Sequence, residues 1–82
     1  MRQRTTIEGR LIAVMESWPL QLTVDVGGEK VAVVLSETAL VRRGGIAAQV
    51  TALLPQSRVR IDGEETSRSP RALRANRVEL LE

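Results

Sequence analysis

Apolar and polar residues alternate strictly along residues 20–35, LQLTVDVGGEKVAVVL, on both sides of a Gly-Gly pair. Alternation with a period of two places successive side chains on opposite faces of a β-strand. Gly27 and Gly28 supply the positive φ angles that a two-residue hairpin turn requires. The pattern therefore predicts two antiparallel strands, roughly residues 20–26 and 30–35, joined by a tight turn.

A run of β-branched and aliphatic residues precedes this hairpin. Residues 5–16, TTIEGRLIAVME, contain Gly9 within the run. Because a glycine inside a strand often marks a bulge or a sharp bend, we expect a long first strand that bends near this residue. The segment over residues 17–19, Ser-Trp-Pro, ends it.

The apolar period changes after a polar loop over residues 36–45. Spacings of four, three and one between apolar positions predict a short amphipathic helix over residues 46–54. Gly45 serves as its N-cap and Pro55 prevents its continuation. The apolar face of this helix would consist of Ile46, Val50, Leu53 and Leu54.

Alternation returns in residues 57–63, SRVRIDG, which predicts a fourth strand. Residues 64–70 are polar and predict a loop. The last segment, residues 71–82, fits either a helix that begins at Pro70 or a bulged strand. The strand is favoured because the edge of the sheet needs a partner to close it.

The predicted order of three strands, a short helix and two strands resembles that of the OB-fold, a five-stranded Greek-key barrel. Gly9 lies where OB barrels coil their first strand, and the helix over 46–54 lies where it plugs one end of the barrel. The resemblance covers nearly the whole chain and is strongest to small bacterial OB-like domains of no established function. It implies an all-β barrel with one short helix, formed by residues 1–82 as a single domain. A small SH3-like barrel is the alternative.

The composition excludes several classes of chemistry. The chain has no cysteine and no histidine, so disulfides, thiolate or imidazole metal sites and Ser-His or Cys-His nucleophiles are excluded. No acid–base pair or cofactor-binding loop is visible, and we predict a non-enzyme with no cofactor and no metal. Residues 1–10 contain no apolar signal region and no apolar run reaches membrane-spanning length, which predicts a cytoplasmic protein without a membrane partner.

The formal net charge is only +2, but all basic residues except Lys30 are arginine, which suits phosphate recognition. OB barrels commonly bind single-stranded nucleic acid or oligosaccharide across strands two and three, flanked by the loops after strands one and four. The resemblance implies a basic stripe in which Arg10 lies beside two outward arginines of the fourth strand. Arg68 lies in the loop expected at 64–70 and Arg71 follows it directly; the resemblance implies that this loop after the fourth strand is mobile and contacts the ligand. The nucleic-acid-binding residues predicted in this way are Arg10, Trp18, Lys30, Arg58, Arg60, Arg68 and Arg71.

Two observations oppose this prediction. Glu8 and Asp62 lie where they would form cross-strand ion pairs with the arginine stripe. The outward positions of strands two and three carry no aromatic residue, whereas single-strand binders usually stack bases on aromatic side chains. Trp18 is the only aromatic residue, and a half-buried position at the rim of the core is the favoured interpretation for it.

Two other candidate surfaces remain. A small anion would fit the start of the predicted helix through Arg42, Arg43, Gly44 and Gly45. A protein interface would use apolar residues outside the core, for which the candidates are Ala32, Val34, Leu80 and Leu81. The leading hypothesis is a module that binds single-stranded nucleic acid weakly and without sequence specificity. The alternative is a protein-interaction module that forms homo-oligomers and has no nucleic-acid ligand.

Overall fold

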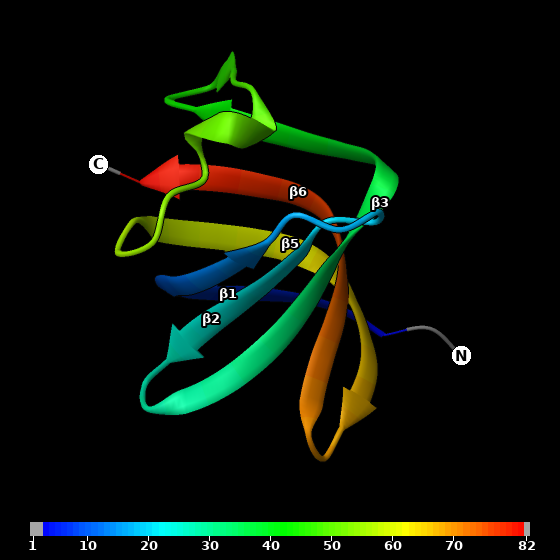
Figure 1. Cartoon of the computed structure of the whole chain (residues 1–82). Helices are drawn as coiled ribbons and strands as arrows, with labels where there is room; N and C mark the ends of the chain where they lie inside the picture. Colours follow the sequence, from blue (N-terminus) through cyan, green and yellow to red (C-terminus); the bar gives the residue numbers. More distant parts are fainter. Residues whose placement is uncertain (1–2, 82) are drawn as a thin grey trace.

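Strands account for most of the chain in the computed structural model, which describes residues 3–81 (Figure 1). The strands are β1 (Arg4–Met15), β2 (Gln21–Val26), β3 (Glu29–Arg43), β4 (Ile46–Ala47), β5 (Arg58–Arg68) and β6 (Arg71–Leu81), with one 3₁₀ turn, η1 (Val50–Ala52).

The five long strands close into a barrel. The hydrogen-bonded order is β2-β1-β5-β6-β3-β4, and an additional β2–β3 pairing joins the ends of the ring. β3 and β6 run parallel, and all other pairs are antiparallel. The five-stranded barrel expected from the OB resemblance is therefore confirmed. Within residues 3–81, closure leaves only the two-residue β4 as an edge strand.

The barrel interior is filled by aliphatic side chains, as the composition requires. Buried side chains alternate with exposed or partly buried ones along β2, the first half of β3 and the start of β5. No polar or charged side chain among the described residues is fully buried. The core consists of Ile7, Leu11, Leu22, Val24, Val31, Val33, Leu35, Val41, Leu53, Val59, Ile61, Leu73, Ala75, Val78 and Leu80.

Gly9 allows two strands of the barrel to approach closely. A Cβ atom at this position would overlap the carbonyl oxygen of Asp25 on β2. The bend expected in the first strand is present as a register shift between Leu11 and Ala13 in the β1–β2 pairing. Gly9 thus allows the close approach of β1 and β2, and the register shift between these strands falls two to four residues later.

The helix predicted over residues 46–54 is wrong. Gly44 and Gly45 have φ angles of +59° and +80° and form a hairpin turn, after which Ile46 and Ala47 pair with the end of β3. Only the three-residue turn η1 follows. The apolar period was misleading because Ile46, Val50 and Leu54 are 72%, 50% and 60% exposed, and only Leu53 enters the core.

Two predicted loops are also strands. β3 continues through residues 36–43, because its two halves pair with β6 on either side of a bulge between Leu35 and Leu40. β5 continues past Gly63 to Arg68, so residues 64–68 belong to a strand that pairs with β6, with a register shift between Glu65 and Ser67, rather than to a loop. The favoured strand assignment for the last segment is confirmed by β6.

Candidate nucleic-acid interface

Trp18 projects from the loop between β1 and β2. Its side chain is 84% exposed, so the interpretation as a half-buried rim residue is wrong. The loop is closed by a hydrogen bond of 2.8 Å that the Ser17 hydroxyl donates to the carbonyl oxygen of Pro19. An exposed indole held on a short ordered loop is available for stacking on a flat ligand.

A groove lies between Trp18 and residues of β3, β5 and β6. Its volume is about 450 Å³. We call it the tryptophan groove; it is lined by Trp18, Pro19, Val34, Leu35, Ser36, Glu37, Thr66, Leu73 and Arg74. It therefore combines one aromatic side chain and one guanidinium with hydroxyl groups and a carboxylate.

Small side chains cover the sheet beside the tryptophan groove. Thr23 on β2 lies opposite Ala32 on β3, which in turn lies opposite Ala72 on β6. In the neighbouring row, Gln21 lies opposite Val34, which lies opposite Arg74. Because several of these side chains are short, an extended ligand can approach the backbone of β2, β3 and β6 closely on their outer face.

Ser36 contributes the only buried side-chain atom without a hydrogen-bond partner in residues 3–81. It lies at the bulge where β3 leaves β6, between Leu35 and Leu40, and lines the tryptophan groove. A buried hydroxyl without a partner is costly, and a ligand with a donor or acceptor in the groove would satisfy it.

Cationic side chains also lie in register across β3, β1 and β5. Arg10 on β1 lies directly opposite Arg58 on β5, as expected for the basic stripe. On the other side, Arg10 faces Asp25, which faces Lys30 on β3. One oxygen of the Asp25 carboxylate accepts a hydrogen bond of 2.8 Å from the backbone N–H of Gly28. Within residues 3–81 neither arginine forms an ion pair, so the two like charges face each other without a salt bridge, and Asp25 is the acidic residue in register with Arg10.

Arg60 is compensated, unlike its neighbours in the stripe. Its Nε donates a hydrogen bond of 2.8 Å to Glu8 on β1. This hydrogen bond, and after it the charge of Glu8, raise the pKa of Arg60 above its ordinary value. The guanidinium is thus charged at every working pH, but its charge is already shared with a carboxylate.

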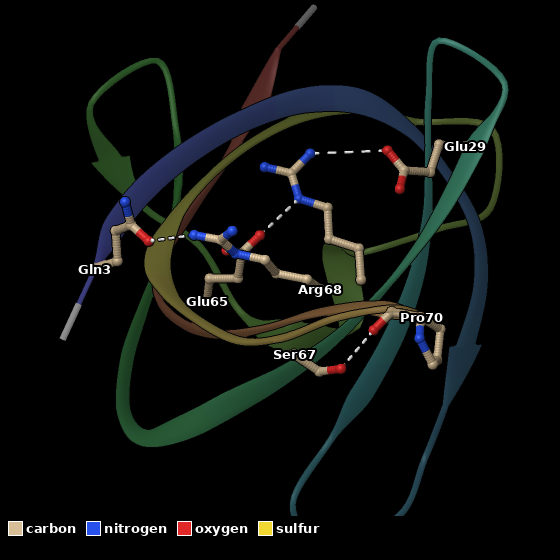
Figure 2. A network of polar contacts seen from close by, with 7 residues as sticks. Gln3, Glu29, Glu65, Ser67, Arg68 and Pro70 are labelled. Carbon is tan, nitrogen blue, oxygen red and sulfur yellow. Dashed lines mark hydrogen bonds and ion pairs between the residues drawn. The ribbon is translucent and has the colours of Figure 1, made fainter. Parts of the chain in front are cut away.

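Arg68 and Arg71 are also engaged, at the end of the β5–β6 hairpin (Figure 2). Nε of Arg71 donates to Glu65 at 3.2 Å, and its Nη1 lies 3.9 Å from Glu29 at the start of β3. Arg68 lies 3.5 Å from Glu65 and donates to the side chain of Gln3 at 3.4 Å. This network joins the β5–β6 hairpin to β3 and the N-terminal segment, whereas the sequence predicted a mobile ligand-contact loop.

The structure does not support the reasoning behind two other predicted sites. The anion site required a helix N-terminus at Gly45, and the two glycines instead form the β3–β4 turn, with Arg43 exposed beside it. The predicted protein interface is wrong at Leu80, which is 3% exposed and part of the core. Of the remaining interface candidates, Ala32 is exposed, whereas Val34 and Leu81 are partly buried.

Sequence reasoning did not select Arg74, although it lies in the tryptophan groove and has no ion pair in the described part of the chain. The signal was available: strand parity places Arg74 on the outer face, between the buried residues Leu73 and Ala75. It was missed because the last segment was also compatible with a helix.

Comparisons with known proteins bear on the fold. No protein-family model and no curated protein matches the sequence. Among solved structures, the chain resembles one chain of the crystal structure of the S. pombe Stn1–Ten1 complex, with a TM-score of 0.71 and 24% sequence identity over 99% of this chain. It spans 59% of that chain. Together with the strand topology, this likeness defines the class: the protein has an OB-fold barrel.

No helix within residues 3–81 is long and apolar enough to cross a bilayer. The same residues contain no group of three or more acidic side chains arranged to hold a metal ion.

Proposed function

We propose that this protein is a non-enzymatic module that binds single-stranded nucleic acid on the outer face of β2, β3 and β6. One base stacks on Trp18 at the end of the tryptophan groove. The phosphates contact Arg74 in the groove and, beyond the small side chains of the sheet, the cationic row formed by Lys30, Arg10 and Arg58.

The exposed indole at the mouth of the groove is the observation that carries the proposal. An apolar ring that is 84% exposed gains little from its present position, and its π-face is open to a planar ligand. The groove beside it offers a guanidinium for a phosphate and the unsatisfied Ser36 hydroxyl for a base edge. The β2–β3 part of this face and the β1–β2 loop, which carries Trp18, correspond to the surface on which OB barrels commonly bind single strands.

The arginines differ in whether a carboxylate already neutralises their charge. Arg10 and Arg58 form no ion pair among the described residues, so a phosphate relieves their mutual repulsion. Arg60, Arg68 and Arg71 already share their charge with Glu8 or Glu65. We therefore assign phosphate contacts to Arg10 and Arg58, in addition to those of Lys30 and Arg74, and a structural role to the other three.

Binding of this kind is weak and depends on salt. One stacked base contributes roughly 1–3 kcal/mol. Each phosphate neutralised on a single strand adds about 0.7 to the slope of log K against log salt, so three or four contacts give a slope of roughly −2 to −3. With few contacts and a net charge of only +2, we expect dissociation constants in the micromolar range, about 1–100 µM at low salt.

The experiment is a fluorescence anisotropy titration of a labelled 12-nucleotide single strand at several salt concentrations, with Trp18 emission recorded in parallel. The expected result is saturable binding with the stated salt slope and quenching of the indole. A duplex of the same sequence is the control and should bind more weakly, because its bases are not free to stack. No saturable binding to the single strand at low salt overturns the proposal.

A further inference from the structure

A second groove lies on the other side of Trp18, at the end of the barrel. It has a volume of about 500 Å³ and a mainly aliphatic lining that includes Val14, Leu20, Val50 and Leu54. We call it the apolar groove. Val50 and Leu54 are 50% and 60% exposed, because the turn η1 covers this end of the barrel with three residues where a full helix was expected.

One charged side chain lines the apolar groove, the carboxylate of Glu16. This residue forms no ion pair within residues 3–81. No cation lines the groove, so a phosphate backbone is repelled from it. The complementary occupant carries an apolar side chain beside a positive charge.

The β3–β4 hairpin presents this combination. Ile46 is 72% exposed and lies directly opposite Arg43, which is also exposed. Within residues 3–81 Arg43 has no ion pair. Figure 1 shows the green β3–β4 hairpin next to the light-green turn η1. Val50 and Thr51 of this turn line the apolar groove.

We propose that two copies of this chain form a symmetric dimer in which the β3–β4 hairpin of each copy docks in the apolar groove of the other. Ile46 enters the groove beside Leu54, and Arg43 pairs with Glu16. Because hairpin and groove lie at the same end of the barrel, one two-fold axis makes both contacts at once, and the assembly closes at two chains.

The size of the surface is compatible with a weak dimer. A standard interface buries about 800 Å² per partner, which is roughly one seventh of the 5544 Å² accessible surface of this chain. The proposed dimer has to bury an area near the lower end of the range for specific interfaces, because each contact is made by one short hairpin. We therefore expect a dissociation constant of roughly 10–100 µM.

The first experiment is sedimentation velocity from 5 to 500 µM protein, without nucleic acid. The wild-type chain should pass from monomer to dimer, and Trp18 emission should shift to shorter wavelength, because the indole borders the groove that is filled. Leu54→Asp should raise the dissociation constant at least 100-fold. Leu40→Asp is the matched control, since Leu40 is 47% exposed on β3 and lies outside the groove. Circular dichroism verifies that both variants are folded.

The second experiment exchanges the charges. Arg43→Glu and Glu16→Arg should each raise the dissociation constant roughly 25-fold, because each homodimer then contains two repulsive contacts worth about fivefold apiece. An equimolar mixture of the two variants should dimerise about as well as the wild type, because the mixed dimer restores an opposite-charge pair at both contacts.

A wild-type chain that remains monomeric at 500 µM overturns this proposal. So does a dimer that Leu54→Asp leaves intact, which would lie on another surface, and so does a mixture of the charge variants that stays monomeric. None of these outcomes affects the nucleic-acid proposal, whose titration is read from a labelled oligonucleotide.

Discussion

Five arginines of the barrel surface form two groups that differ in their partners. Arg60, Arg68 and Arg71 lie within 3.5 Å of a carboxylate oxygen. Arg10 and Arg58 face each other across β1 and β5 without an ion pair in the described residues. The first group stabilises contacts between strands and hairpins. The second group carries uncompensated charge and is therefore the one suited to an anionic ligand.

The largest effect should come from removing the uncompensated pair. Arg10→Ala combined with Arg58→Ala should weaken single-strand binding roughly 30-fold at about 50 mM salt and reduce the salt slope by about 1.4, because two phosphate contacts are lost. Anisotropy titrations at four salt concentrations measure both quantities. Arg68→Ala combined with Arg71→Ala is the matched control, and an equal loss in that variant would abolish the distinction between the two groups.

Trp18→Ala should weaken binding about tenfold while leaving the salt slope unchanged, because stacking is lost and no phosphate contact is touched. Trp18→Leu separates stacking from apolar contact. If the leucine variant binds as tightly as the wild type, the indole acts through apolar area rather than through its ring.

Glu8→Gln should move Arg60 from the compensated group to the uncompensated one. The released guanidinium lies on the same face as Arg58, so we expect affinity to rise roughly threefold and the salt slope to increase by about 0.7. Glu79→Gln serves as the comparison, because Glu79 lies opposite Arg60 on β6 without forming an ion pair. Unchanged affinity in Glu8→Gln would mean that the path of the strand does not reach Arg60.

The smallest expected effect is on the free energy of unfolding, which should change in opposite directions when an arginine of one group or of the other is replaced. Arg58→Gln should raise the free energy of unfolding by about 0.5 kcal/mol, because a like-charge pair across two strands is removed. Arg60→Gln should lower it, because the hydrogen bond to Glu8 is lost. Urea unfolding monitored by circular dichroism measures both values. A decrease in both variants would show that Arg58 has a stabilising contact of its own.

The predictable parts of the fold were the local ones. The turn at Gly27 and Gly28 followed from the alternating residues on either side. The same dipeptide at Gly44 and Gly45 was assigned to a loop, because the flanking residues Arg42-Arg43 and Ile46-Ala47 are too few to show a period. The continuation of β3 past Leu35 depends on its pairing with β6, about 40 residues further along the chain. No local pattern records such a contact.

Only part of the candidate site could likewise be predicted from the sequence. Strand parity placed Arg58 and Arg60 on one face, and the register confirms that Arg10 lies beside them. Which of these arginines is neutralised depends on side-chain positions across strands, as with Glu8 and Arg60. The exposure of Trp18 depends on how the β1–β2 loop leaves the barrel, and composition favoured the opposite interpretation.

The position of β6 between β3 and β5 has a consequence for biosynthesis. β6 is translated after the other barrel strands, yet it supplies the partner for one side of each of these two strands. Until it emerges from the ribosome, β3 and β5 expose unpaired backbone groups along most of their length, and the aliphatic interior is open to water. A translational pause before residue 71 would prolong this open state, and such exposed strand edges are prone to pair with other chains. Cotranslational chaperones would therefore have their main effect on this barrel in the interval before β6 emerges.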